Sequence, residues 1–326
     1  MPAIPADVRI LIDLEPVVAD ALDTHLRTTV DWYPHQYVPW GQGRDYDGLL
    51  EGEPWDPSQQ KLRAAARDGL LYSLLTEENL PSYHRVIGEM LSLDGPWGVW
   101  VNRWTVEEAR HGTAIRDYLV VTRSADPVLL EDARAAHVQH GYEIDYRGDL
   151  IASLVYVTVQ ELGTRVSYQG IRRLCDEPVC GALMQRIAHD ENRHMLFYRT
   201  TLQACMRMHP DRTLQAVARV LKSFRPPGHA APGFGRLISS LARSGILSPE
   251  IYYKDIALPF VRMLGALDAT GLAPVGQHAQ EEIAAHMEES AGRAGRYRAL
   301  AERVNRLTTA RDDDSAIRDG DTAVRA

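Results

Sequence analysis

Two short segments of the chain share one pattern of charged residues. Residues 104–112 read WTVEEARHG, and residues 187–195 read IAHDENRHM. Each segment contains a Glu-x-x-His pair, and these pairs are Glu108 with His111 and Glu191 with His194. Residues three apart share a face of an α-helix, so each pair can present a carboxylate and an imidazole to one metal ion. One such pair alone is typical of a solvated polar face.

A further acidic residue lies about one helix upstream of each pair. Glu77 precedes Glu108 by 31 residues, and Glu161 precedes Glu191 by 30. Four-helix bundles that carry two iron or manganese ions use a lone Glu from each of two helices and a Glu-x-x-His pair from each of the other two. The sequence therefore predicts six metal ligands: Glu77, Glu108, His111, Glu161, Glu191 and His194. Glu78 adjoins Glu77, and the spacing leaves either of them as the first ligand.

The surroundings of Glu161 also favour a metal. Residues 151–164 read IASLVYVTVQELGT, in which Glu161 is the single charged side chain. A buried carboxylate is costly unless it is neutralised or bound to a cation. The alternative is a protonated or hydrogen-bonded core glutamate. Carboxylate and imidazole suit iron, manganese and zinc alike. We expect two ferrous ions, because zinc is redox-inert and iron can reduce dioxygen, with manganese as the alternative.

The acidic residue before each pair has two interpretations. Glu107 and Asp190 are placed to accept the second ring N–H of the histidines, as metal-bound imidazoles require. They can equally pair with Arg110 or Arg193 at the surface.

Apolar residues recur at helical spacing along most of the chain, and strand-like alternation is nearly absent, so the predicted fold class is all-α. A first helix begins near Val8 and ends before Tyr33. Residues 34–57 contain four prolines and are expected to form an irregular loop. Further helices are predicted at 58–79, 82–93, 97–123, 127–140, 149–175, 177–208, 249–264 and 275–307.

These elements divide the chain into four parts: an N-terminal helix and loop (1–57), a four-helix bundle core with the metal site (58–225), a loop with further helices packed on the core (226–307), and a disordered tail (308–326). Pro210 and the proline- and glycine-rich segment 226–235 are expected to form a second irregular loop. The tail contains three consecutive aspartates and few apolar residues, which is typical of disorder.

Composition excludes several classes of protein. The net charge of −8 argues against general binding to nucleic acid or to an anionic membrane. The longest apolar stretch, at 150–159, is shorter than the ~20 residues of a membrane span. The N-terminal residues do not resemble a signal peptide. The three cysteines are too few for a disulfide framework, so we interpret them as core thiols of a cytoplasmic protein.

The motifs resemble those of the soluble acyl-[acyl-carrier-protein] desaturases of plant plastids and actinobacteria. The resemblance covers roughly residues 50–210 and fades after Pro226. It rests on WDP at 55–57, TEENLP at 76–81, the segment 104–112, Gln160-Glu161 with Thr164, and DENRH at 190–194. It implies a homodimer with a ferritin-like four-helix bundle core extended by additional helices. It also implies two iron ions that use dioxygen to desaturate a fatty-acyl chain carried on acyl carrier protein.

The resemblance assigns individual roles. It implies that Glu77 rather than Glu78 is a ligand, that Glu108 and Glu191 bridge the irons, and that Thr164 assists oxygen activation. It further implies that electrons from a ferredoxin-type donor pass along Trp55, Asp190 and His111, although Trp55 can equally be a packing residue. The sequence departs from the plant pattern at Ala109, Tyr168 and Met195, which leaves every ligand in place and bears on electron delivery and substrate selectivity.

The acyl chain needs a narrow apolar channel beside the metals. The residues predicted to line it are Met90, Ile115, Leu154, Val157 and Met184, for which plain core packing is the alternative. Because acyl carrier proteins are acidic, we expect a basic rim, with a scattered solvated face as the alternative. The basic residues proposed for the rim are Arg172, Arg173, Arg207, Arg219, Lys222 and Arg225.

Other uses of such a metal site remain open. The alternatives include a ribonucleotide reductase radical subunit and an arylamine oxygenase. A cofactor tyrosine near the metals would favour the radical subunit, and Tyr118 and Tyr198 are candidates. A non-enzymatic iron-storage protein is a further alternative. Its subunits are generally shorter, so the long loops and the C-terminal third of this chain argue against it.

Overall fold

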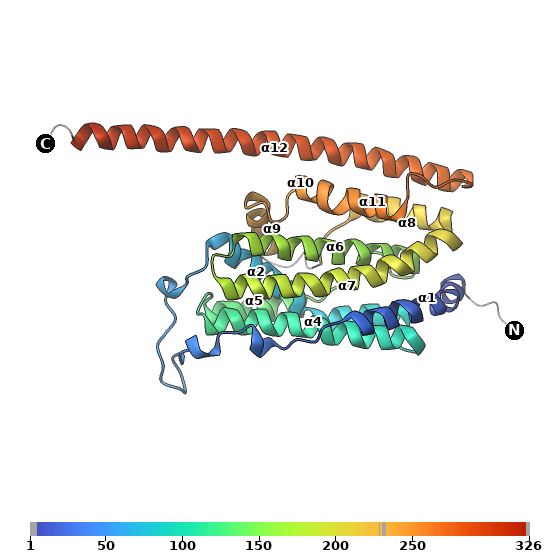
Figure 1. Ribbon diagram of the computed structural model, residues 1–326, viewed down its shortest axis with the longest axis horizontal. Coiled ribbons are helices and arrows are strands. Elements are labelled where there is room, and N and C mark those ends of the chain that lie inside the picture. The colour runs from blue at the N-terminus through green and yellow to red at the C-terminus, as the bar shows by residue number, and fades with distance from the viewer. Residues whose placement is uncertain (1–4, 228, 230–232, 324–326) are drawn as a thin grey trace.

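The computed structural model describes residues 5–227, 229 and 233–323, and nearly all of its regular structure is helical (Figure 1). The described residues contain no β-strand, so the all-α prediction is confirmed. The first seven helices are α1 (Ala6–Thr28), α2 (Ala64–Glu78), α3 (Leu80–Leu91), α4 (Gly95–Val121), α5 (Pro127–His140), α6 (Leu150–Leu174) and α7 (Pro178–Met208). The loop between α1 and α2 contains three short 3₁₀ turns, at Pro34–Gln36, Trp40–Gln42 and Pro57–Gln59.

Four of these helices form the central bundle. α6 packs along α7, α2 packs against α4 and α6, and α4 also contacts α7. α1 lies across α4 and α7 and covers that side of the bundle (Figure 1). This ferritin-like arrangement places the helices that carry the predicted ligands around one common interior.

The remaining helices form outer layers on the α6 side. They are α8 (Pro210–Ser223), α9 (Phe234–Arg243), α10 (Pro249–Ile251), α11 (Leu258–Leu264) and α12 (Pro274–Ala323), with a π-helix at Tyr252–Ala257 that joins α10 to α11. Figure 1 shows α12 as the outermost layer, above α8, α10 and α11. None of the helices in the described ranges has the length and apolar character needed to cross a membrane.

Local sequence explains where two of the bundle helices, α6 and α7, begin. The Asp149 carboxylate accepts a hydrogen bond from the Ala152 N–H and caps α6. The Glu177 carboxylate likewise accepts from two backbone N–H groups of α7, and Pro178 occupies the first helical position, where no N–H is needed. α6 is buried on all sides over its first ten residues. That burial is why its sequence is nearly continuously apolar.

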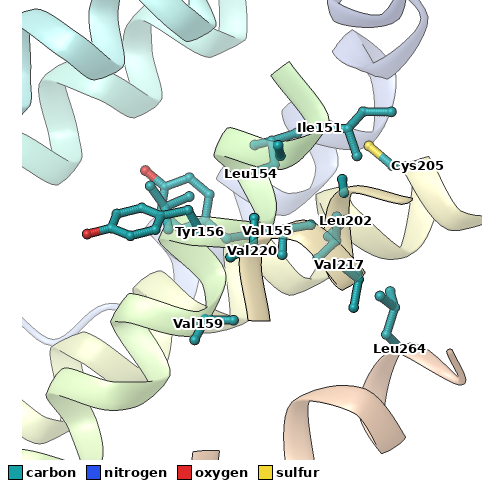
Figure 2. Packing of buried hydrophobic residues seen from close by; sticks show 14 of the residues in the cluster. Ile151, Leu154, Val155, Tyr156, Val159, Leu202, Cys205, Val217, Val220 and Leu264 are labelled. Carbon is teal, nitrogen blue, oxygen red and sulfur yellow. The ribbon is translucent and has the colours of Figure 1, made fainter. Parts of the chain in front are cut away.

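The outer layers share a hydrophobic core with the bundle. Figure 2 shows apolar side chains of α6 pointing toward those of α7, α8 and α11. The labelled residues of this cluster include Ile151, Val155, Leu202, Cys205, Val217, Val220 and Leu264. The face of α6 that is turned away from the predicted metal site is therefore covered by helices from the C-terminal third of the chain.

Two predictions about the C-terminal half need correction. Residues 210–223 form helix α8, because Pro210 lies in its first turn, where proline initiates a helix instead of breaking it. α9 begins at Phe234, inside the expected second loop. α12 ends at Ala323, and the disorder expected for residues 308–326 stays a prediction. Residues 324–326 lie outside the described residues.

Truncation of Leu202 tests the shared core. The Leu202 side chain of α7 is fully buried in the cluster shared with α6 and α8. Leu202→Ala should therefore lower the free energy of unfolding by about 2–5 kcal/mol in urea denaturation. Leu129→Ala on α5 is the matched control, because Leu129 is 65% exposed and its loss should cost less than about 0.5 kcal/mol. Equal effects of the two changes would contradict the packing described.

Candidate metal centre

The six predicted ligands converge in the interior of the bundle. Their ligand atoms form two overlapping groups, and within each group they lie within 4.8 Å of one another. Glu108 and Glu191 belong to both groups, and every member is buried. The groups are Glu77, Glu108, His111 and Glu191 on one side, and Glu108, Glu161, Glu191 and His194 on the other.

The neighbouring acidic residue Glu78 points elsewhere. Its carboxylate oxygens each lie 3.3 Å from an arginine, one from Arg116 and the other from Arg134. The geometry thus places Glu77 in the cluster and Glu78 in a separate ion-pair network.

The two imidazoles turn their Nδ1 atoms toward the carboxylates. His111 Nδ1 lies 3.4 Å from both Glu108 Oε2 and Glu191 Oε1, and His194 Nδ1 lies 2.7 Å from Glu108 Oε1. The last pair is close but not aligned as a hydrogen bond, and both Nδ1 atoms lack a hydrogen-bond partner. Glu108 Oε1 and Glu191 Oε1 also have none. Buried polar atoms without partners are costly, and these four atoms face one another as metal ligands would.

Electrostatics also favour cations in the cluster. Burial, together with the neighbouring carboxylates, raises the pKa of Glu77 and of Glu161 well above the usual range. Four carboxylates cannot all ionise in such a site unless positive charge is supplied. Two divalent ions would balance their four negative charges. The oxygen and nitrogen ligands therefore fit a dinuclear site, and they suit iron or manganese.

The second nitrogen of each imidazole contacts an acidic residue from the other motif. His194 Nε2 lies 2.8 Å from Glu107 Oε2, and His111 Nε2 lies 3.4 Å from Asp190 Oδ2. Although burial raises the pKa of Glu107, its hydrogen bonds to His194 and His25 outweigh burial and hold that pKa below the usual range. Burial likewise raises the pKa of Asp190, but its hydrogen bond to His111 and its other partners outweigh burial, so the pKa lies below the usual range.

Both acidic residues are almost completely buried, which excludes a surface ion pair as their main contact. Arg110 Nη2 is 3.9 Å from Glu107, whereas Arg103 Nε donates to Glu107 at 2.6 Å. Asp190 pairs with Arg186, while Arg193 donates to the hydroxyls of Thr28 and Thr29.

Each acidic residue also binds a ring from the N-terminal segment. His25 Nε2 lies 3.0 Å from Glu107 Oε2, and Trp32 Nε1 donates to Asp190 Oδ2 at 2.6 Å. Two rows therefore lead to the cluster, His25–Glu107–His194 and Trp32–Asp190–His111. His25 continues the buried stripe of α1, so a polar residue in phase with Leu14 and Val18 was the available signal. Trp32 lies beyond the end of α1, so no helical period in the sequence could indicate its position.

Trp55 does not lie in either row. Its indole N–H donates to the backbone oxygen of Arg123 at 3.0 Å, and the place beside Asp190 is taken by Trp32. The Trp–Asp–His arrangement expected from the resemblance is therefore present with a different tryptophan. The physical reason is that the loop carrying Trp55 folds against the end of α4, whereas the chain leaving α1 passes directly over the bundle.

Three further donors contact the ligand carboxylates. Trp104 Nε1 donates to Glu161 Oε1 at 3.1 Å, and the Tyr168 hydroxyl donates to Glu77 Oε1. Thr164 Oγ1 donates to Glu191 Oε2 at 3.0 Å. Neither of the tyrosines considered for a radical role bonds to the cluster: Tyr118 donates to Glu177, and the Tyr198 hydroxyl has no partner.

Two cavities adjoin the cluster. The larger measures about 480 Å³ and the smaller about 30 Å³, and both are lined by Thr76, Gln160 and Thr164. The smaller one also touches Glu77, Glu108, Glu161 and Glu191. Of the residues predicted to line a channel, Val157 lines the smaller cavity, whereas Met90, Ile115, Leu154 and Met184 line neither. The last four belong to the packed interior and its margin.

The predicted basic rim is only partly at this cavity. Lys222 and Arg225 line the larger cavity, and Arg219 lines a separate surface groove with Lys222. Arg172, Arg173 and Arg207 line neither the cavity nor the groove. Periodicity on the bundle helices could not show this, because the cavity wall is built largely by the segments after α7.

The fold and the cluster together define a helical-bundle protein with a buried carboxylate–histidine site of the kind that holds two metal ions. The profile of the fatty acid desaturase family matches residues 6–315, so the chain belongs to that family. It is 40% identical over 285 residues to a Mycobacterium tuberculosis protein provisionally named acyl-[acyl-carrier-protein] desaturase DesA1, covering 85% of this chain and 84% of that protein.

More distant relatives are also named as acyl-[acyl-carrier-protein] desaturases. The chain is 26% identical over 318 residues to the chloroplastic stearoyl-[acyl-carrier-protein] 9-desaturase of Linum usitatissimum, covering 87% of this chain and 74% of that protein. Among solved structures, it resembles the provisionally assigned acyl-ACP desaturase DesA2 of M. tuberculosis, with a TM-score of 0.68 and 29% identity. That match covers 83% of this chain and 99% of the other.

Removal of the Glu107 carboxylate tests the row that supports His194. Glu107→Ala leaves His194 Nε2 and His25 Nε2 without their acceptor, so the dissociation constant for ferrous ion in an anaerobic titration should rise about 10–100-fold. Val106→Ala is the control on the same helix, because Val106 is 58% exposed and should leave the constant unchanged. If Glu107→Ala bound ferrous ion with unaltered affinity, Glu107 would not support His194 as a metal ligand.

Metal binding should release protons. Because burial raises the pKa of Glu77 and Glu161, both hold a proton in the metal-free protein at a pH where an exposed glutamate is ionised, and the metal must displace it. We therefore expect the affinity for ferrous ion to weaken as the pH falls. Calorimetry in two buffers of different ionisation enthalpy measures the release. Glu78→Gln should leave the number of protons released unchanged, since Glu78 pairs with arginines. If the unaltered protein released no protons on binding ferrous ion, the prediction would be contradicted.

Proposed function

We propose that this chain is an acyl-[acyl-carrier-protein] desaturase that introduces a double bond into a fatty-acyl chain. The observation that carries the proposal is the larger cavity, which is mostly apolar and reaches Thr164 and Gln160 at the edge of the carboxylate–histidine cluster. A long apolar ligand in this cavity would lie beside the metal ligands. An iron-storage protein has no use for such a cavity, and the names of the relatives point to the same substrate class.

The residues that would hold the metal are Glu77, Glu108, His111, Glu161, Glu191 and His194, and Glu108 and Glu191 would be available to both ions because they belong to both groups. Two iron ions bound there would supply the reduction of dioxygen and the removal of hydrogen from unactivated C–H bonds. Overall, one dioxygen molecule, two electrons and two protons join the two hydrogens removed from adjacent methylenes to give two water molecules.

The chain's own residues orient the substrate and supply protons. The apolar cavity wall excludes water and holds the acyl chain extended, which fixes the carbons that pass the cluster. The Thr164 hydroxyl, which donates to Glu191, is placed to hold a proton at the end of the cavity nearest the cluster. The row Trp32–Asp190–His111 is proposed as the route for electrons from a ferredoxin-type donor, since its indole and imidazole rings stack with centroids 6.3 Å apart.

Two further features belong to the proposal. A homodimer is supported by exposed apolar side chains on the neighbouring helices α1 and α4, namely Val8, Ile12 and Val99. A cytoplasmic location is supported by the cysteines, which are all free thiols.

The direct test is turnover. Iron-loaded protein is incubated with acyl carrier proteins charged with saturated chains of different lengths, ferredoxin, reductant and air, and the released fatty acids are analysed by mass spectrometry. A product lighter by two hydrogens is expected. Glu191→Ala should abolish both iron binding and product, because Glu191 belongs to both ligand groups. Iron-loaded protein that yields no unsaturated product with any chain would refute the proposal.

Thr164→Val separates proton supply from metal binding. Valine keeps the shape of threonine but lacks the hydroxyl that donates to Glu191. We expect full iron content and a rate of product formation lower by about 10²-fold, the low end for a positioned proton donor. Ser167→Ala is the control one turn further along the same cavity wall and should retain the rate. Equal rates for Thr164→Val and the unaltered enzyme would exclude this role.

A further inference from the structure

The larger cavity has an uneven distribution of charge along its wall. Three cationic side chains line it, Lys222, Arg225 and Arg293, and no aspartate or glutamate is among the described residues that do so. This is unusual for a chain with net charge −8. The apolar wall suits an aliphatic chain, and the cationic part suits an anionic group attached to it.

The two arginines have little compensation from acidic neighbours. Among the described residues, the guanidinium of Arg225 donates a hydrogen bond only to the backbone oxygen of Phe224, at 2.9 Å. Arg293 donates to Ser290 Oγ at 3.1 Å, and its nearest carboxylate, that of Glu289, is 3.9 Å away. By contrast, Lys222 is already paired with Glu282. Arg225 and Arg293 are therefore the cations available to a ligand.

A buried hydroxyl without a hydrogen-bond partner lies in the wall of the same cavity. Tyr252, on the π-helix, lines the same cavity, and its hydroxyl is buried with no hydrogen-bond partner. Burial raises its pKa to about 12, while Arg293 and Arg225 are both near enough to oppose that rise. A protonated phenol beside two guanidinium groups is a complete donor set for an anion. Buried donors of this kind normally have a partner, which here the ligand would provide.

We propose that Arg225, Arg293 and Tyr252 form an anion subsite that binds the phosphate of a phosphopantetheine thioester arm. The proposal rests on the proposed function and adds which part of the substrate is recognised. The acyl chain would occupy the apolar part of the cavity. The arm would leave past Ser248, His286 and Ser290, which also line the cavity, and its phosphate would meet the two guanidinium groups. Arginine suits this role because its planar donors match phosphate oxygens.

Binding of non-hydrolysable thioethers tests the subsite without turnover. The probes are S-alkyl pantetheine with and without its 4′-phosphate, and the readout is the dissociation constant from calorimetry with the full chain. The unaltered protein should bind the phosphorylated probe at least about tenfold more tightly. The double variant Arg225→Gln/Arg293→Gln should abolish that preference and leave the affinity for the phosphate-free probe unchanged.

Two further variants sharpen the result. Tyr252→Phe should reduce the preference for the phosphorylated probe by a smaller factor, because it removes one donor and no charge. Arg85→Gln on α3 is the control for net charge, since Arg85 is 48% exposed, pairs with Glu89 and does not line the cavity. It should retain the full preference.

The possible results separate this inference from the proposed function. Equal affinity of the unaltered protein for the two probes would overturn the subsite, even if acyl carrier protein substrates are desaturated. A preference that depends on the arginines would support it, even if turnover fails. A free fatty acid of the same chain length serves as the third probe. If its binding alone depends on Arg225 and Arg293, the site recognises a carboxylate and the phosphate assignment is wrong.

Discussion

The burial of four carboxylates at the centre of one helical bundle is the constraint on which this structure depends. Without compensating charge, the pKa values of Glu77 and Glu161 rise and the two carboxyls hold protons. With two divalent ions, all four groups can ionise and the cluster becomes neutral. The unpartnered Nδ1 atoms of His111 and His194 show that the protein alone does not satisfy this interior. The fold is organised to hold cations.

The contacts around the cluster explain why the N-terminal segment is part of the site. Each histidine is oriented by the acidic residue of the opposite motif, so the two Glu-x-x-His segments support each other across the bundle. These acidic residues are in turn bound by His25 and Trp32. The two rows have the same plan and different outer rings, an imidazole in one and an indole in the other. The two halves of the centre are consequently not chemically equivalent.

Sequence alone could predict the cluster because metal ligands must share helix faces, and spacing records this requirement directly. The bundle helices were predictable for the same reason, since burial leaves a period in the sequence. Sequence could not show that Trp32, and not Trp55, lies beside Asp190, because the position of each depends on where a loop crosses the fold, which has no period. The channel residues Ile115, Leu154 and Met184 failed for another reason: apolar periodicity marks burial, and it does not distinguish a packed side chain from one that faces a void. Proline at 210 was misleading because it both ends and begins helices.

The position of α12 has a mechanical consequence. This helix supplies His286, Ser290 and Arg293 to one wall of the larger cavity, yet it carries none of the six residues of the cluster. It rests mainly on α8 and on the segment from α10 to the π-helix, outside the bundle (Figure 1). A small displacement of α12 would change the width of the larger cavity without moving the six residues of the cluster. The helix that helps to form the cavity wall is thus separate from the helices that carry the cluster.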